Sequence, residues 1–180
     1  MGHIVSKDGI KIDPKRVEAI DTINIPRNVK EIQSFLGKII FLRRFIPNFA
    51  EIVKLITDML KKNNEVKWKT EAKALFAHIK KFIAEAPVLA SPNYLKEFLI
   101  FSFSFEHTIV AVLLQKNEEG FEQSIAFFSK SLRDVELKYD IIEKQEYAMV
   151  KALKAFRTYV LHSKIIAYVP TSSVKDILVQ

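Results

Sequence analysis

The spacing of the apolar residues changes in the middle of this chain, at a stretch with two prolines, residues 87–96. Before this stretch the apolar residues recur at helical spacing, as they do over residues 75–83. After it they form short runs of β-prone residues. We therefore expect a hairpin and a helical region over residues 1–90, a connector over residues 91–97, and a region built on a sheet over residues 98–180.

Two local signals predict how the chain begins. Asp8-Gly9 lies between two short β-branched runs, which is the pattern of a tight hairpin. Asp13 followed by Pro14 predicts the start of a helix, with Asp13 as the cap and Pro14 at the first helical position. The chain should therefore enter its helical region through a short hairpin.

Three longer helices should follow in this region. Asn28 can cap the first of them, because Glu31 follows at the spacing of a capping box. This helix is expected to run to about Phe45, and the next two are expected over about residues 50–62 and 70–86. The apolar stripe of the first helix should contain Ile32, Phe35, Leu36 and Ile39.

The last part of the chain should form a mixed sheet in the order β-β-β-α-β-α. Short connections between three β-prone runs predict an antiparallel meander. A long helix is expected over about residues 135–160, then a strand over 164–169 and a short final helix capped by Ser172 or Ser173. The fold class is therefore α+β or α/β, with a small helical bundle before a mixed sheet. The three runs of the meander cover residues 98–105, 108–114 and 124–128.

The composition excludes several classes of function. Without cysteine the chain has no disulfides and no cysteine-based zinc site, and its four histidines show no ligand spacing. Four glycines are too few for a glycine-rich phosphate loop. An apolar run of about 18 residues, as a transmembrane helix needs, is missing, and the first residues do not read as a secretory signal. We therefore expect an intracellular protein, cytoplasmic or nuclear, with no membrane partner.

The positive charge of the chain is confined to its first half. The net charge is +7, and residues 1–95 carry the whole excess, whereas residues 96–180 are balanced. A basic helical region attracts a phosphate backbone. A solvated surface with surplus lysine is the alternative interpretation.

Several linked motifs resemble the reverse transcriptases of gypsy-type LTR retrotransposons. Residues 29–37, V-K-E-I-Q-S-F-L-G, and residues 43–49, R-R-F-I-P-N-F, resemble the thumb of that family. Residues 2–15 resemble the end of the palm. Residues 128–139 resemble the A-S-R-S-L…E…Y segment of the RNase H domain, and residues 152–159 resemble the end of its long helix. The resemblance therefore covers nearly the whole chain.

This resemblance implies the C-terminal part of such an enzyme: the end of the palm, the thumb and a truncated RNase H-like domain. The order β-β-β-α-β-α opens the RNase H fold, whose last strand and closing helix are not expected here. A Y-x-D-D polymerase motif is missing, so polymerisation by that mechanism is excluded. The thumb lies beside the nucleic-acid duplex in this family, which implies contacts to an RNA–DNA hybrid, although exposed basic helix surface is the alternative. The candidate contact residues are Lys30, Lys38, Arg43 and Arg44.

The RNase H chemistry of this family uses two Mg²⁺ ions held by carboxylates. Alignment through residues 111–113 places the first catalytic Asp at Phe103, where a strand residue packing apolar surface is expected. The family's Glu falls on Gln145 and its next Asp on Pro170. These residues offer no anionic oxygen, so neither catalysis nor a metal cofactor is expected. Nearby carboxylates are best interpreted as solvated surface charge: Glu106, Glu143 and Glu146.

Three functions remain open from the sequence. The first is a retroelement-derived fragment without catalysis that at most binds nucleic acid. The second is an active RNA–DNA hybrid ribonuclease, which fold analogy alone would assign. The third is a structural module like the connection domain of retroviral enzymes, forming homo-oligomers through an unpaired sheet edge.

Overall fold

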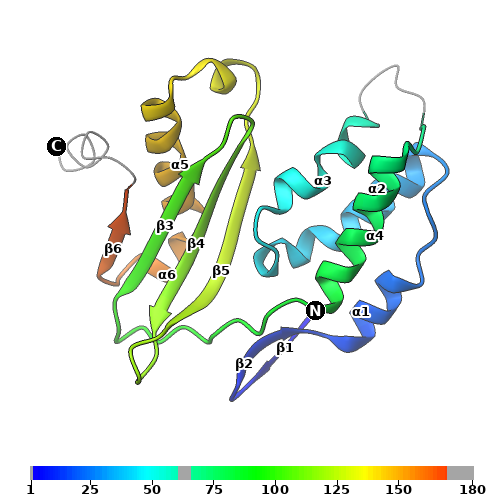
Figure 1. The fold of residues 1–180 in the computed structure, drawn as a ribbon. Coiled ribbons are helices and arrows are strands. Elements are labelled where there is room, and N and C mark those ends of the chain that lie inside the picture. Colours follow the sequence, from blue (N-terminus) through cyan, green and yellow to red (C-terminus); the bar gives the residue numbers. More distant parts are fainter. Residues whose placement is uncertain (1, 61–65, 170–180) are drawn as a thin grey trace.

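The computed structural model describes residues 2–60 and 66–169, and Figure 1 shows how their elements are arranged. A helical part and a sheet part lie side by side, with a two-stranded hairpin at one end of the helical part. The chain passes from one part to the other through residues 85–97. None of the helices within the described ranges is both long and apolar enough to cross a membrane.

The hairpin forms where Asp8-Gly9 predicts it, between β1 (His3–Ser6) and β2 (Gly9–Ile12). The cap at Asp13 is also confirmed, because its Oδ1 accepts a hydrogen bond of 3.0 Å from the N–H of Lys15. The elements of the helical part are α1 (Pro14–Asp21), α2 (Val29–Ile39), η1 (Ile40–Phe45), α3 (Phe49–Asp58) and α4 (Thr70–Ala84).

The helix that was expected to reach Phe45 is α-helical only to Ile39, and its last turns form the 3₁₀ helix η1. A 3₁₀ helix has three residues per turn, so residues three apart share one face. Ile39, Leu42 and Phe45 follow this spacing, and all three are buried. Burial of this face accounts for the tighter winding. Part of the next predicted helix, residues 61–62, lies outside the described residues.

The four-stranded sheet confirms the predicted meander. Its strand order is β5-β4-β3-β6, with antiparallel pairing from β3 to β5 and parallel pairing of β6 with β3. The strands are β3 (Phe98–Ser104), β4 (Thr108–Lys116), β5 (Glu122–Ser131) and β6 (Ile165–Tyr168). Ser172 and Ser173, the expected caps of a final helix, lie outside the described residues.

The expected long helix over residues 135–160 is divided into three. Its parts are η2 (Asp134–Lys138), α5 (Ile141–Ala155) and α6 (Arg157–Val160). Asp140 starts α5, because its Oδ1 accepts a hydrogen bond from the N–H of Glu143, whose Oε2 accepts one from the N–H of Asp140. This reciprocal capping box ends the preceding turn and begins a new helix.

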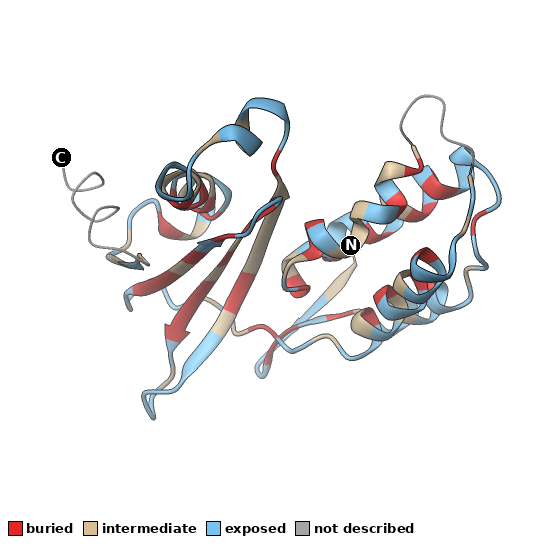
Figure 2. Cartoon of the chain, turned by 45° about the horizontal axis from the view of Figure 1, so that its top comes forward, coloured by how far each residue is buried: buried red, intermediate tan, exposed pale blue. Residues whose placement is uncertain are grey.

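Within the described residues the buried apolar side chains form two large hydrophobic cores and a small third cluster of Ile109, Leu132 and Ala148. Figure 2 shows buried residues inside the helical part and between the sheet and α5. The first core is built on α2, α3 and α4, and the second packs Met149 and Ala152 of α5 against β3 and β4. The two parts also touch directly. The Oγ of Ser129 on β5 accepts a hydrogen bond of 2.9 Å from the N–H of Ala50 on α3, and Phe127 packs against the first core.

Candidate nucleic-acid interface and nuclease-site positions

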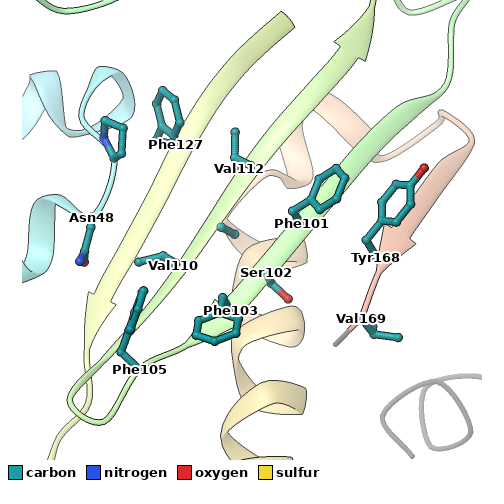
Figure 3. Close-up of a pocket in the computed structure, with 12 residues that line it drawn as sticks. Asn48, Phe101, Ser102, Phe103, Phe105, Val110, Val112, Phe127, Tyr168 and Val169 are labelled. Atoms are coloured by element: carbon teal, nitrogen blue, oxygen red, sulfur yellow. The ribbon is translucent and has the colours of Figure 1, made fainter. Parts of the chain in front are cut away.

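Phe103 lies on β3 and Gln145 lies on α5, which packs against β3. Their side chains are on opposite faces of the sheet. Side chains alternate between faces along a strand, and Ser102 faces α5, with its Oγ 4.0 Å from the Sδ of Met149. Phe103 therefore points to the other face, as Figure 3 shows. Pro170, the third position, is outside the described residues. The structure does not bring the side chains of the first two positions together.

Gln145 is integrated into the core rather than presented to solvent. Its side chain is buried, with 5% of its surface exposed. Its Oε1 accepts a hydrogen bond of 3.1 Å from the N–H of Ser104. A neutral amide suits this position, since burial of a charged carboxylate would require a compensating cation. Gln145 thus ties α5 to the end of β3.

The change Gln145→Leu should lower the free energy of unfolding by about 1–3 kcal/mol, because the N–H of Ser104 would be buried without an acceptor. Urea denaturation measures this loss. Gln33→Leu is the matched control, since Gln33 is exposed on α2 and should change stability by less than about 0.5 kcal/mol. Equal stability of the Gln145→Leu variant and the parent would contradict the structural role.

Phe103 packs against the ring of Phe105, with 5.1 Å between ring centroids, but 46% of its surface is exposed. It lines an apolar groove of about 630 Å³ on the face of the sheet opposite α5 (Figure 3). The ring of Phe101 stacks on that of Tyr168 in this groove, with 4.2 Å between ring centroids. The other apolar side chains along the groove include Phe105, Val110, Val112 and Phe127. Such a lining offers a divalent cation almost no oxygen ligands.

The three nearby carboxylates do not gather at this site. The Glu106 side chain is 84% exposed and lies 3.5 Å from the Nε2 of His107, and Glu143 is engaged in the cap of α5. Across residues 2–60 and 66–169, there is no group of three or more His, Cys, Asp and Glu side chains that could hold a metal ion. The side chains at Phe103 and Gln145 do not fit a magnesium pair.

An ionic network connects β5, η2 and α5. The Nζ of Lys130 lies 2.5 Å and 2.7 Å from the two carboxylate oxygens of Glu136 and 2.9 Å from the hydroxyl of Tyr147. Tyr147 also donates to Glu136. Burial alone would raise the pKa of Glu136, but hydrogen bonds from Lys130, Tyr147 and the N–H of Arg133 outweigh it and lower the pKa to about 2.

This network predicts acid sensitivity. The pKa of Glu136 is lower in the folded chain than its ordinary 4.5. Its ionised carboxylate therefore contributes fully to the free energy of unfolding above about pH 4.5, and this contribution is lost as the pH falls towards 2. A shift of this size corresponds to at most about 3 kcal/mol. Denaturation from pH 7 to pH 3 should show the stability gap between the parent and Glu136→Gln closing. A gap that does not change with pH would contradict this assignment.

The basic residues predicted to contact nucleic acid lie on α2 and η1. Lys30 and Lys38 are exposed on α2, and Arg43 is exposed on η1. Arg44 is half-buried, and its Cζ lies 5.7 Å from the ring centroid of Phe45 and 5.9 Å from that of Tyr159. The structure brings Arg43 and Arg44 into one cleft that Lys30 and Lys38 do not line.

The residues of the sheet part that line this cleft with the two arginines were not predicted from the sequence. Thr158 and Tyr159 of α6 line the same cleft as Arg44. Nothing in the local sequence links α6 to η1, because only the packing of the helical part on β5 brings them together. The apolar groove could have been predicted from the sequence. Phe101, Phe103 and Phe105 alternate with serines at the period of a strand, which places the three rings on one face of the sheet.

The chain is similar to polyproteins of known retrotransposons. Residues 68–167 match the protein family described as "RNase H-like domain found in reverse transcriptase". The chain is 40% identical over 162 residues to the "Retrovirus-related Pol polyprotein from transposon 297" of Drosophila melanogaster, which covers 89% of this chain and 15% of that protein. The polyprotein of transposon opus is 33% identical over 170 residues, covering 88% of this chain and 17% of its own length. "Transposon Tf2-3 polyprotein" of Schizosaccharomyces pombe is 26% identical, and the match covers 88% of this chain and 12% of that protein.

Solved reverse transcriptases share the fold. A foamy viral protease-reverse transcriptase, dRH, in complex with ds DNA superimposes with a TM-score of 0.86 at 26% identity, over 100% of this chain and 32% of that one. The foamy viral enzyme in complex with RNA/DNA hybrid superimposes with a TM-score of 0.82 at 27% identity, over 95% of this chain and 23% of that one. This chain spans less than a fifth of the length of the three transposon polyproteins named above. The resemblance to gypsy-type reverse transcriptases is confirmed, and the chain belongs to the family of RNase H-like domains found in reverse transcriptases.

Proposed function

We propose that this chain is a non-catalytic part of a retrotransposon reverse transcriptase that binds nucleic acid. One observation supports the non-catalytic assignment. The resemblance to the family places its metal-binding Glu at Gln145, and the amide of Gln145 is buried and hydrogen-bonded to the backbone of β3. Catalysis by two metals needs anionic oxygens that offset the repulsion between the ions, and neither Gln145 nor Phe103 supplies one.

Nucleic-acid binding is supported by the charge and by the structural relatives. The basic excess of the chain lies in residues 1–95, and Lys30, Lys38 and Arg43 are exposed there. The foamy viral relatives were solved with ds DNA and with RNA/DNA hybrid. We propose the same partners for this chain, with the phosphate backbone contacted by α2 and η1. The expected division of the chain into residues 1–90, 91–97 and 98–180 is part of the proposal and is supported by the two hydrophobic cores.

Titration of a labelled RNA–DNA hybrid at several salt concentrations tests the binding. Each phosphate contact releases counterions, so the logarithm of the binding constant should fall linearly with the logarithm of the salt concentration. Four contacts correspond to a slope of about −3 to −4. Undetectable binding at low salt, or binding that salt does not weaken, would contradict the proposal.

The two other functions predict different results. An active ribonuclease would cut the hybrid in Mg²⁺ or Mn²⁺, and the cleavage would disappear on changing Glu106 or Glu146. A connection-like module that forms homo-oligomers through a sheet edge would show a mass that rises with concentration in light scattering. Both experiments use the full chain and can be run beside the titration.

A further inference from the structure

A cleft of about 420 Å³ lies where the helical part meets the sheet part. One wall comes from η1, with Phe41, Arg43 and Arg44. The other wall comes from β5 and from the end of the α5–α6 segment, with Thr158 and Tyr159. The cleft is therefore complete only when the two parts are packed together.

Arg44 is held in this cleft by aromatic rings. Its guanidinium lies over Phe45 and Tyr159, one ring from each part of the chain. Its Nε is buried and has no hydrogen-bond acceptor among the described residues. A buried donor without an acceptor is unfavourable, so an acceptor that reaches the guanidinium of Arg44 in this cleft would stabilise it.

The chemistry of the cleft selects an anion. Among the residues that line it are Arg43, Arg44, Thr158 and Tyr159, and none of the lining residues carries a carboxylate. The planar guanidinium matches two oxygens of a phosphate at once, which a lysine cannot do. The contacts with the rings of Phe45 and Tyr159 restrict the Arg44 side chain, so less side-chain entropy is lost when it binds.

We propose that this cleft binds one backbone phosphate of a nucleic-acid duplex, through Arg44 with help from Arg43. The inference rests on the proposed nucleic-acid binding and adds to it a composite site that needs both parts of the chain. A phosphate bound there bridges η1 and α6. Binding at this cleft therefore depends on how the helical part is packed on the sheet.

The test follows the Nε–H resonance of Arg44 by NMR in the ¹⁵N-labelled full chain, assigned by its absence in Arg44→Lys. A short RNA–DNA hybrid should shift this resonance, and Arg44→Lys should bind the hybrid roughly tenfold more weakly. The lysine keeps the charge, so the variant is expected to fold. Arg133→Lys is the matched control, at the exposed residue before η2, and should bind with the affinity of the parent. Inorganic phosphate alone is the second probe.

Each other outcome overturns a different statement. Hybrid binding with an unmoved Arg44 resonance overturns the cleft assignment and leaves the proposed function standing. Absence of any hybrid binding overturns both. If inorganic phosphate moves the resonance while Arg44→Lys binds the hybrid as tightly as the parent, the cleft is a small-anion site and the duplex assignment is wrong.

Discussion

Neutralisation of the four predicted contact residues should weaken binding to an RNA–DNA hybrid on the order of a thousandfold at 0.1 M salt. The variant carries glutamine at Lys30, Lys38, Arg43 and Arg44. Each lost phosphate contact lowers the salt dependence by about 0.9 in the logarithmic slope, so the four together should remove about three to four units. Fluorescence anisotropy from 50 to 200 mM salt measures both the binding constant and its dependence on salt.

A control variant with the same loss of charge separates local contact from general attraction. Four exposed lysines in the charge-balanced half of the chain are changed to glutamine: Lys116, Lys138, Lys154 and Lys164. If α2 and η1 hold the duplex, this control should bind only slightly more weakly than the parent. Equal losses in the two variants would show that net charge alone drives binding, which contradicts a defined interface.

Replacement of Gly9 by alanine should lower the free energy of unfolding by about 3 kcal/mol or more. Gly9 has a φ of +126°, a conformation that side-chain-bearing residues avoid, and a Cβ there would lie 2.3 Å from the carbonyl oxygen of Leu89. Next to it, Ile10 and Leu89 exchange two backbone hydrogen bonds of 2.7 and 2.8 Å. The variant should therefore release the hairpin from the end of the helical part. Urea denaturation gives the loss, and hydrogen exchange at Ile10 locates it.

Two other glycines serve as controls. Gly120 also has a positive φ, +86°, but a Cβ there would meet no atom within 4 Å, so Gly120→Ala should cost only the backbone strain, about 1 kcal/mol. Gly37 lies inside α2 with open space around it, and Gly37→Ala should stabilise the chain by about 0.5–1 kcal/mol. If Gly9→Ala costs no more than Gly120→Ala, the close contact with Leu89 does not matter for stability.

The features that could be predicted from the sequence depend on residues close together in the chain. Asn28 caps α2 as expected, because its Oδ1 accepts a hydrogen bond of 2.9 Å from the N–H of Glu31. The reciprocal bond of the expected capping box is shifted by one residue, since the Oε2 of Glu31 accepts a hydrogen bond of 2.7 Å from the N–H of Arg27. The hairpin at Asp8-Gly9 and the cap at Asp13 are local in the same sense. Each signal acts through the backbone of a few neighbouring residues, so it needs no tertiary contact.

The features that could not be predicted depend on packing between distant segments. The 3₁₀ winding of η1 follows from burial of Leu42 and Phe45, which the α-helical pattern alone does not require. The contact of Arg44 with Tyr159 exists only because β5 lies against the helical part. The capping box of Asp140 and Glu143 was readable in the sequence, but the long helical pattern around it concealed the break.

The central claim is that the chain holds an RNA–DNA hybrid and does not cut it. The most direct test incubates the full chain with labelled hybrid in Mg²⁺, and separately in Mn²⁺, at a protein concentration that saturates binding. The account predicts that all of the hybrid is bound and that its RNA strand is recovered intact. Metal-dependent cleavage of that strand, lost when EDTA is added, would contradict it.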